Sequence, residues 1–389
     1  MITLGGRFIP IQHTRSLRAR VLRVTSQTEN VEILPEKSAY LVDETPPPNG
    51  FSAYLYVQGR SAAAEGEMLK SPAALLPASF GYLADGDLVS FRTNDGNIRV
   101  LYRKSSRHNS FLVTERCDNY CLMCSQPPRD INDNWIADEI LESIPMIDKE
   151  TAELGFTGGE PTLLGEHFLE ILRTCAKDLP NTTIHVLSNG RKFSDPNFAR
   201  AWSKTGITDL MVGIPLYSDV STIHDYVVQA DGAFDETVRG ILNLKALRQR
   251  VELRVVLHKQ TYKHLARLAE FIARNLLFID QVALMGLEIM GFTRANLDVL
   301  WIDPVEYQDQ LDRAVRTLDS AGMKVLIYNH QLCLLPRSLW PFAVKSISDW
   351  KNEYLEECES CTVRDQCGGF FHSAKYRRSA NIRPILERG

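Results

Sequence analysis

The sequence predicts an α/β protein whose central part is a partial barrel of six β–α units. Three observations lead to this prediction. Short β-rich runs separated by turn residues fill about residues 1–108, strand-like and helical runs alternate over about 109–322, and cysteines gather in 323–389. We therefore expect a small, mostly β N-terminal domain, an α/β core and a cysteine-rich C-terminal extension. This division agrees with the length of 389 residues, because one domain usually has about 100–200 residues.

The N-terminal part shows strand signals with turn chemistry between them. The runs rich in β-branched and aromatic residues are Arg20–Val24, Ala39–Val42, Phe51–Val57, Asp87–Arg92 and Ile98–Tyr102. The turn Asn94-Asp95-Gly96-Asn97 joins the last two runs and predicts a β-hairpin.

In the core, each strand-like run is followed by a helical run. The expected strands are Phe111–Thr114, Leu154–Thr157, Ile184–Leu187, Leu210–Ile214, Leu253–Leu257 and Val282–Ile289. The expected helices are Ile136–Ile147, Glu166–Leu179, Pro196–Lys204, Phe234–Leu247, Leu265–Leu276 and Pro304–Leu318. Such alternation predicts a parallel sheet wrapped by helices, with ligands at the carboxyl ends of the strands. A further strand-like run, Val325–Tyr328, opens the C-terminal extension.

Charge and hydropathy exclude several classes of function. The formal net charge is −4, so nothing electrostatic favours binding to nucleic acid or to an anionic membrane. The apolar runs are far shorter than the roughly 18 residues of a spanning helix. The first residues, Met1–Gly6, lack a basic stretch followed by an apolar run, so we expect no signal peptide and a cytoplasmic protein with reduced thiols.

Cys117, Cys121 and Cys124 form a C-x3-C-x2-C pattern directly after the first core strand. Three thiolates in one loop can surround one metal centre, and soft thiolates select zinc, copper(I) or iron–sulfur clusters. A closed zinc site needs four ligands, so a zinc knuckle would require a distant residue. Three ligands instead leave one metal corner open, as in a [4Fe–4S] cluster that binds a further molecule.

A second set of cysteines lies near the C-terminus: Cys333, Cys358, Cys361 and Cys367. Four thiolates are enough to close a metal site, and either a structural zinc ion or an iron–sulfur cluster fits them. The eighth cysteine, Cys175, lies within an expected helix and is interpreted as an ordinary buried thiol.

The C-x3-C-x2-C loop after the first strand resembles that of the radical S-adenosylmethionine (SAM) enzymes. The resemblance implies that Cys117, Cys121 and Cys124 hold a catalytic [4Fe–4S] cluster to which SAM binds. The stretch Gly158-Gly159-Glu160 resembles the family's GGE motif, which implies that it holds the amino group of SAM. Ser188 and Asn189, at the end of the third strand, are expected near SAM as well. The residue before the third cysteine is commonly aromatic in the family, and here it is Met123.

Two longer stretches narrow the resemblance to the C-type radical SAM maturases of the His-Xaa-Ser system (HxsC). They are Cys117–Pro128 and the tail Tyr328–Pro336 running on to Ser346–Lys351. This resemblance implies an enzyme that cleaves SAM reductively to a 5′-deoxyadenosyl radical and modifies a ribosomally made precursor peptide carrying His-Xaa-Ser repeats. It also implies two protein partners, a second radical SAM protein and a small protein, together with an external electron donor. The second cysteine set would then hold an auxiliary [4Fe–4S] cluster in a twitch- or SPASM-like extension, with a zinc ion as the alternative. The N-terminal domain is expected to recognise the peptide, for instance by accepting it as an added strand at a sheet edge.

Two other functions remain open from the sequence. In the first, the chain is a radical SAM enzyme that acts on a small metabolite. In the second, the chain is a non-catalytic protein that binds the peptide. Release of deoxyadenosine on reduction separates the enzymes from the binding protein.

Overall fold

The computed structural model describes residues 4–12, 21–28, 34–43, 46–61, 72–92, 96–345 and 352–386. Arg20, the turn residues Asn94 and Asp95, and the tail segment Ser346–Lys351 lie outside the described residues. The chain divides into two compact units that alternate along the sequence. The first comprises Met1–Phe111, Asn134–Leu154 and Glu170–Thr183, and the second comprises Leu112–Asp133, Gly155–Leu169 and Ile184–Gly389.

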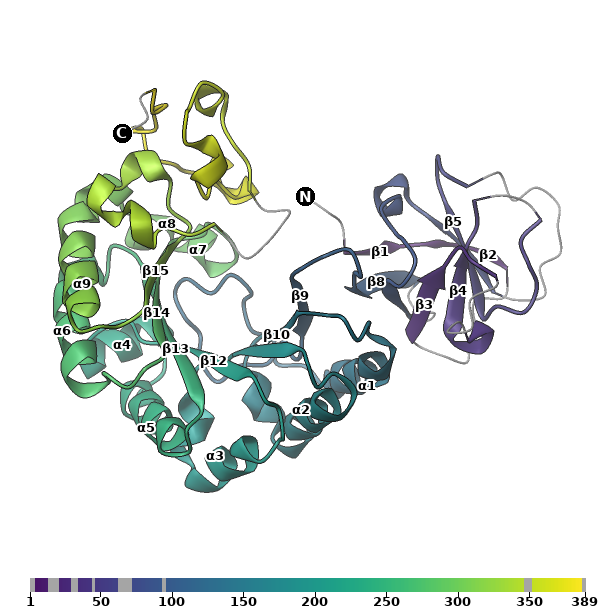
Figure 1. The fold of residues 1–389 in the computed structure, drawn as a ribbon, viewed down its shortest axis with the longest axis horizontal. Coiled ribbons are helices and arrows are strands. Elements are labelled where there is room, and N and C mark those ends of the chain that lie inside the picture. The colour runs from purple at the N-terminus through teal and green to yellow at the C-terminus, as the bar shows by residue number, and fades with distance from the viewer. Residues whose placement is uncertain are drawn as a thin grey trace. The chain divides into compact units, whose positions relative to one another are not determined.

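The N-terminal part forms a sheet of eight described strands in the order β1-β8-β7-β3-β4-β5-β6-β2 (Figure 1). The strands are β1 Gly5–Arg7, β2 Ile9–Gln12, β3 Val21–Thr25, β4 Ser38–Leu41, β5 Ala53–Val57, β6 Ala73–Leu76, β7 Leu88–Arg92 and β8 Asn97–Tyr102. β7 and β8 pair antiparallel, which confirms the predicted hairpin. The edge strands β1 and β2 are consecutive in the chain and are separated only by the buried Phe8, so the two ends of the sheet are joined. Among the described strands, no long edge is therefore left for a peptide to extend by strand addition.

A buried carboxylate fastens this sheet to α1 (Asn134–Ser143) within the first unit. Glu139 on α1 is 1% exposed and accepts hydrogen bonds from Ser90 of β7 and Arg99 of β8. The Arg99 guanidinium also lies over the ring of Trp135, 4.9 Å from its centroid. The charge on Glu139 is therefore paired and hydrogen-bonded, which is the condition under which a buried carboxylate is tolerated.

The second sheet has the order β15-β14-β13-β12-β11-β10-β9. Its strands are β9 Asn109–Leu112, β10 Glu153–Thr157, β11 Thr183–Leu187, β12 Leu210–Pro215, β13 Arg250–Leu257, β14 Gln281–Gly286 and β15 Val325–Tyr328. The pairs from β11 to β15 are all parallel. Besides α1, the helices are α2 Glu166–Asp178, α3 Pro196–Ser203, α4 Ser221–Val228, α5 Ala233–Ala246, α6 Leu265–Asn275, α7 Phe292–Ala295, α8 Leu297–Leu300 and α9 Gln308–Ser320. The fold is thus the expected mixed α/β fold with a partial barrel.

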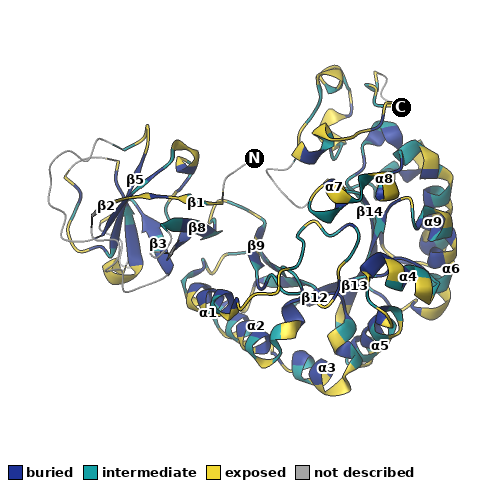
Figure 2. Ribbon diagram, turned by 180° about the vertical axis from the view of Figure 1, so that it is seen from behind, coloured by how far each residue is buried: buried dark blue, intermediate teal, exposed yellow. Residues whose placement is uncertain are grey.

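The helices of this part bury one side and expose the other (Figure 2). In α6, for example, Leu265, Leu268, Ala269 and Ile272 are buried at the i, i+3, i+4, i+7 spacing of an amphipathic helix. The strands are buried more completely, as in β12, where five of the six residues are buried. A parallel strand covered on both sides needs this continuous apolar sequence.

Among the differences between the expected core and the structure, two concern the strands next to the site. β15 pairs with β14 in the same sheet, so the barrel has a seventh strand drawn from residues that we placed in the C-terminal extension. β14 ends at Gly286 and not at Ile289, because its last paired residues are Met285, opposite Tyr328 of β15, and Gly286, opposite Leu257 of β13.

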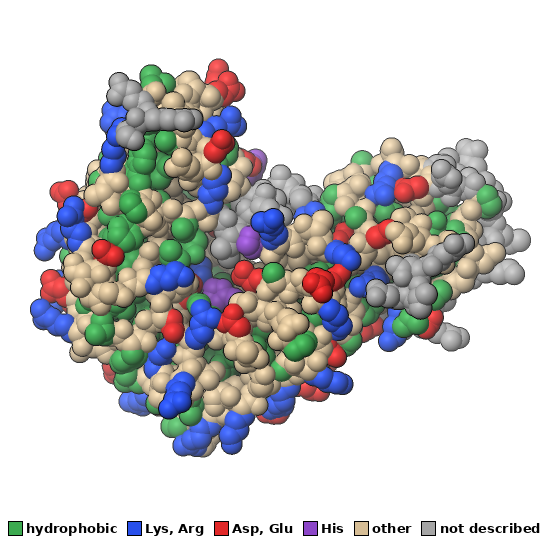
Figure 3. Space-filling view, viewed as in Figure 1, with side chains coloured by type: hydrophobic (Ala, Val, Ile, Leu, Met, Phe, Trp, Pro, Cys, Tyr) green, Lys and Arg blue, Asp and Glu red, His purple; other side chains and the backbone are tan. Residues whose placement is uncertain are grey.

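Among the described residues, no helix has the length and apolar character needed to cross a membrane. Figure 3 shows basic and acidic side chains interspersed over the visible face, with no gathered basic patch on it. This distribution agrees with the small net charge of −4.

Candidate functional site

An open cavity of about 320 Å³ lies at the carboxyl ends of strands β10 to β14 in the second unit. All three cysteines of the first set line it, together with the predicted site residues Gly158, Gly159, Ser188 and Asn189. The other lining residues are Asn119, Met123, Ser125, Thr157, Leu187, Gly213, Pro215, Tyr217, Arg254, Val256, Met285, Gly286, Leu287, Glu288 and Asn329. The structure therefore brings together residues that lie up to 212 positions apart, at the strand ends where ligands of such folds bind.

Backbone hydrogen bonds from neighbouring elements fix the cysteine loop. The Leu122 amide donates to the Val227 carbonyl at 2.9 Å, at the end of α4. On the other side, the Phe292 amide at the start of α7 donates to the Cys124 carbonyl at 2.8 Å. Met123 is 7% exposed and packs with Tyr217 and Val227. Both short helices, α4 and α7, thus hold the loop through backbone hydrogen bonds, and α4 also packs on its apolar side through Val227.

Two polar side chains that follow β11, the neutral Asn189 and the charged Arg191, hold the same loop. The Asn189 side-chain amide donates to the Asp118 carboxylate at 2.6 Å. The Arg191 guanidinium donates to the Asp118 carbonyl at 2.7 Å and to the Asn119 side chain at 2.8 Å. Arg191 is held in turn by Glu236 of α5, 2.6 Å away. The position of the first two cysteines is therefore coupled to the turn after β11.

The three thiols suit a metal cluster in their chemistry and location. Burial raises the pKa of Cys117 to about 12 and also raises the pKa of Cys121 and Cys124, so without a metal the thiols keep their protons at neutral pH. Among the described residues, no three ligand side chains already surround one point, and the Cys124 thiol donates to the Gln126 carbonyl at 2.9 Å. Metal binding must therefore displace thiol protons and break this hydrogen bond.

Gly158 and Gly159 are required by the backbone beside them. A Cβ on Gly159 would lie 2.0 Å from the Arg116 carbonyl oxygen, and one on Gly158, at φ +144°, would lie 2.4 Å from that of Thr114. The Gly159 amide donates to the Thr114 carbonyl and the Glu160 amide to the Arg116 carbonyl, each at 2.7 Å. The two glycines therefore let β10 continue directly against the chain that enters the cysteine loop, an approach that any side chain would block.

Glu160 does not line the cavity. Its carboxylate is 1% exposed and accepts four hydrogen bonds from the protein. One oxygen accepts from the Thr162 amide at 3.0 Å, the Thr162 hydroxyl at 2.6 Å and the Ser188 hydroxyl at 2.8 Å, and the other accepts from the Asn189 amide at 2.5 Å. Burial raises the pKa of Glu160, against the effect of these four hydrogen bonds. In this arrangement Glu160 ties β10 to the Ser188-Asn189 turn.

The opposite wall of the cavity carries the side chains of Tyr217 and Arg254. Tyr217 follows β12, is 7% exposed and stacks on His224, with 5.8 Å between the ring centroids. Arg254 on β13 donates to the Glu252 carboxylate at 2.7 Å, and Glu252 is 2% exposed. A buried carboxylate thus aims and neutralises the guanidinium at the cavity wall.

The four cysteines of the second set line one small cavity in the C-terminal part. The Leu332 and Gly369 amides both donate to the Cys367 sulfur at 3.5 Å, and the Ile385 amide donates to the Cys361 sulfur at the same distance. Burial raises the pKa of Cys333 and Cys367. The four thiols thus share one cavity, and two of the sulfurs accept hydrogen bonds from backbone amides.

Sequence reasoning missed Asp118, Arg191 and the role of Tyr217. Asp118 lies inside the cysteine pattern and Arg191 directly follows the Ser188-Asn189-Gly190 turn, so proximity to predicted site residues was the available signal. Their pairing across 73 positions is visible only in the fold.

Residues 111–272 match the family model described as the radical SAM superfamily. No curated protein matches the chain. Among solved structures, SuiB of Streptococcus suis bound to S-adenosylmethionine aligns with 15% identity over 59% of this chain and 50% of SuiB, with a TM-score of 0.46. The enzyme anSMEcpe with bound AdoMet aligns with 17% identity over 56% of this chain and 62% of its own, with a TM-score of 0.43. This chain thus spans about half to three-fifths of the length of these two structures.

Proposed function

We propose, on the premise that residues 111–272 form a radical SAM domain, that the chain is an enzyme that cleaves SAM reductively and modifies a ribosomally made peptide. The observation that carries the proposal is the convergence of Cys117, Cys121 and Cys124 on one cavity with Gly158 and Gly159. When bound there, a [4Fe–4S] cluster supplies the electron that splits SAM into methionine and a 5′-deoxyadenosyl radical, which abstracts a hydrogen atom from the substrate.

In this proposal the chain's own residues position SAM and exclude water. The backbone of Gly158 and Gly159 borders the cavity next to the thiols and offers polar groups to the amino acid part of SAM. Arg254, aimed by Glu252, offers a guanidinium to its carboxylate. Glu160 acts by ordering the turn that places Ser188 and Asn189 at the cavity wall.

We further propose that Cys333, Cys358, Cys361 and Cys367 hold an auxiliary [4Fe–4S] cluster. The shared cavity and the amide donors to two of the sulfurs support a thiolate centre there, and the resemblance to peptide maturases favours iron over zinc. A zinc ion in these ligands would have a structural role only.

The proposed substrate is a precursor peptide of the His-Xaa-Ser type, a choice that rests on the sequence resemblance. The corresponding partners are a second radical SAM protein, a small protein of the same system and an external electron donor. Peptide recognition by the N-terminal domain stays part of the proposal, by a surface other than an added strand.

Anaerobic reconstitution followed by reduction with dithionite tests the enzyme. We expect about eight iron and eight sulfide per chain, since each of two clusters holds four of each, and release of deoxyadenosine from SAM. Replacing Cys117, Cys121 and Cys124 by alanine should abolish that release, whereas Cys175→Ala, the matched control at the eighth cysteine, should retain it. Deoxyadenosine release by the triple variant would refute the proposal. Four iron with one zinc would refute the auxiliary cluster alone.

A further inference from the structure

The hydroxyl group of Tyr217 makes no hydrogen bond with the described part of the chain, although this buried side chain lines the cavity of the three cysteines. A buried tyrosine hydroxyl usually has a partner. Three similarly buried tyrosines have one 2.7–2.9 Å from the hydroxyl: Tyr54, Tyr102 and Tyr307. Among the described residues, the polar atoms that the protein encloses without a partner include Nε2 of His258 but not the Tyr217 hydroxyl. The hydroxyl therefore opens to the cavity, where a bound molecule can reach it.

Neighbouring side chains fix the Tyr217 ring before any ligand binds. The Tyr217 amide donates to Nδ1 of His224 at 3.2 Å, and the two rings stack with 5.8 Å between their centroids. The ring of His258 lies 6.2 Å away, and Met123 packs against Tyr217 as well. A donor on a side chain that is already fixed loses little conformational freedom on binding, so the hydroxyl is preorganised for a ligand.

Arg254 supplies a second donor on the same wall. β12 and β13 are parallel neighbours with Pro215 opposite Arg254, and both Pro215 and Tyr217 line the cavity. One guanidinium nitrogen of Arg254 donates to Glu252 at 2.7 Å. The other donates to the sulfur of Met285 at 3.2 Å, and a thioether is a weak acceptor. Two donors without a strong acceptor therefore share this wall.

The Tyr217 hydroxyl lies within electrostatic reach of both the cysteine loop and Arg254. Burial raises the pKa of Tyr217, the thiols of Cys121 and Cys124 raise it further, and Arg254 lowers it. The hydroxyl thus keeps its proton at neutral pH and can donate it to a hydrogen bond. A ligand group that meets both donors needs two acceptor positions, and a carboxylate offers them together with a negative charge.

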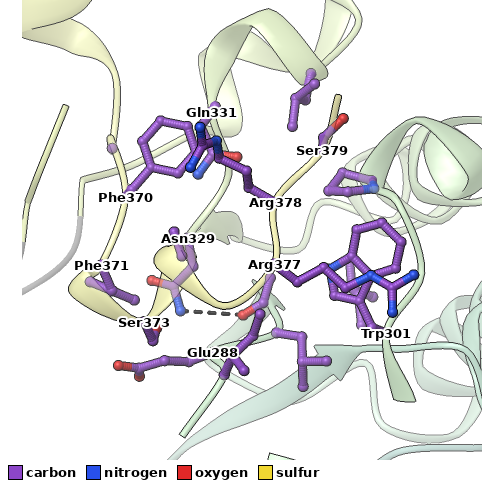
Figure 4. Close-up of a pocket in the computed structure, with 18 of the residues that line it drawn as sticks. Glu288, Trp301, Asn329, Gln331, Phe370, Phe371, Ser373, Arg377, Arg378 and Ser379 are labelled. Carbon is purple, nitrogen blue, oxygen red and sulfur yellow. Dashed lines mark hydrogen bonds between the residues drawn. The ribbon is translucent and has the colours of Figure 1, made fainter. Parts of the chain in front are cut away.

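A second cavity, of about 90 Å³, adjoins the first at the carboxyl ends of β14 and β15 (Figure 4). The two cavities share a wall made of Gly286, Leu287, Glu288 and Asn329. Neither Tyr217 nor Arg254 lines the second cavity. A molecule that meets both donors therefore occupies the first cavity, together with the three cysteines.

We propose that the Tyr217 hydroxyl, together with Arg254, binds the carboxylate of SAM. The inference rests on the proposed function, because it takes SAM to be the molecule in the cavity. Glu252 already offsets the charge of Arg254, so the neutral hydroxyl adds a hydrogen bond to what the paired guanidinium provides. Tyr217 is therefore a specificity-determining residue, which favours SAM over adenosine-containing molecules that lack a carboxylate.

The test compares SAM with decarboxylated SAM, which keeps the adenosine, the sulfonium and the amino group. The affinities of the cluster-loaded, unreduced protein are measured anaerobically by displacement of radiolabelled SAM. Tyr217→Phe keeps the ring and removes the hydroxyl. We expect it to weaken SAM about 10-fold or more and decarboxylated SAM about 2-fold or less, as the loss of one hydrogen bond to a charged group predicts. The melting temperature of the SAM-free variant should not fall, because the hydroxyl has no partner in the described part of the chain.

The matched control is Tyr226→Phe, at an exposed tyrosine on α4, which should leave both affinities unchanged. A measurement on wild-type protein needs no variant: SAM should bind at least about 100-fold more tightly than decarboxylated SAM, because two donors lose their acceptor together. A wild-type ratio below about 10-fold would overturn the inference.

Two results with Tyr217→Phe would also overturn it. An equal loss of affinity for both ligands would assign the hydroxyl to the part of SAM that they share. An unchanged affinity for SAM would leave the hydroxyl to the other substrate. Deoxyadenosine release, measured separately on the wild-type sample after reduction, reports on the proposed function, so the two failures are distinguishable.

Discussion

Glu160 is the position where the sequence and the structure give different roles, and Glu160→Gln separates them. The resemblance to the GGE motif implies that Glu160 binds the amino group of SAM. In the structure, however, the Glu160 carboxylate is buried and accepts hydrogen bonds from four donors of the protein. Glutamine keeps one oxygen for Thr162 and Ser188. Its amide nitrogen then faces the Asn189 amide, so a charge-assisted hydrogen bond of 2.5 Å becomes a contact between two donors.

A hydrogen bond to a buried charged group contributes about 1.5–3 kcal/mol, and the donor left without a partner adds to that loss. We therefore expect Glu160→Gln to destabilise the SAM-free protein by about 2–3 kcal/mol. For a unit of this size such a change lowers the melting temperature by about 4–12 °C.

The assay is thermal unfolding followed by circular dichroism, under anaerobic conditions and without SAM, with SAM affinity measured in parallel by calorimetry. The control is Glu170→Gln, an exposed carboxylate on α2, whose melting temperature should match that of wild-type protein. The reasoning is refuted by a Glu160→Gln protein that melts with the wild type yet binds SAM much more weakly, because that result assigns the carboxylate to the ligand.

Three further predictions concern stability. Gly159→Ala should lower the urea midpoint strongly, because its Cβ would lie 2.0 Å from a backbone oxygen, whereas Gly232→Ala meets nothing within 4 Å and should cost only about 1–2 kcal/mol for its left-handed backbone at φ +75°; equal urea midpoints would contradict this. Glu139→Ala should cost about 3–5 kcal/mol by leaving Arg99 without its buried partner, and a loss of melting temperature no larger than that of an exposed variant would count against it. His224, His258 and His330 are buried, which lowers the pKa of each to about 4, so below pH 6.5 the unfolded chain binds protons that the folded chain does not, and each of the three histidines lowers stability by up to about 3 kcal/mol between pH 6.5 and 4. His258→Gln should reduce, without abolishing, the fall of the melting temperature over that range, and an unchanged slope would exclude His258 as a cause.

Several elements followed directly from local pattern. β15 has the expected bounds, Val325–Tyr328, and α2 begins at the expected residue, Glu166, since each is a continuous run with one periodicity and clear breakers at its ends. The three cysteines were recognisable for the same reason, because a metal-binding loop concentrates its ligands within a few residues.

The short helices α4, α7 and α8 were not expected, and neither was the membership of β15 in the barrel. A helix of four residues, such as α7, is too short to show a period. It forms because its first amide donates to the Cys124 carbonyl, 168 residues earlier in the chain. Sheet membership likewise depends on which strand edges meet, and that is a property of the packed chain.

The sequence alone determined the kind of chemistry: seven cysteines in two sets, a glycine pair after a strand, and an alternation that puts strand ends together. Only the tertiary structure decided how these parts are used. It buried the Glu160 carboxylate among four donors at the ends of two strands, so that this carboxylate does not line the cavity. It also placed Glu288 on a wall shared by two cavities, because Gly286 and Asn329 directly follow the paired strand ends Met285 and Tyr328. Residue type limits what a side chain can bind, but its direction is set by neighbours that the linear order does not reveal.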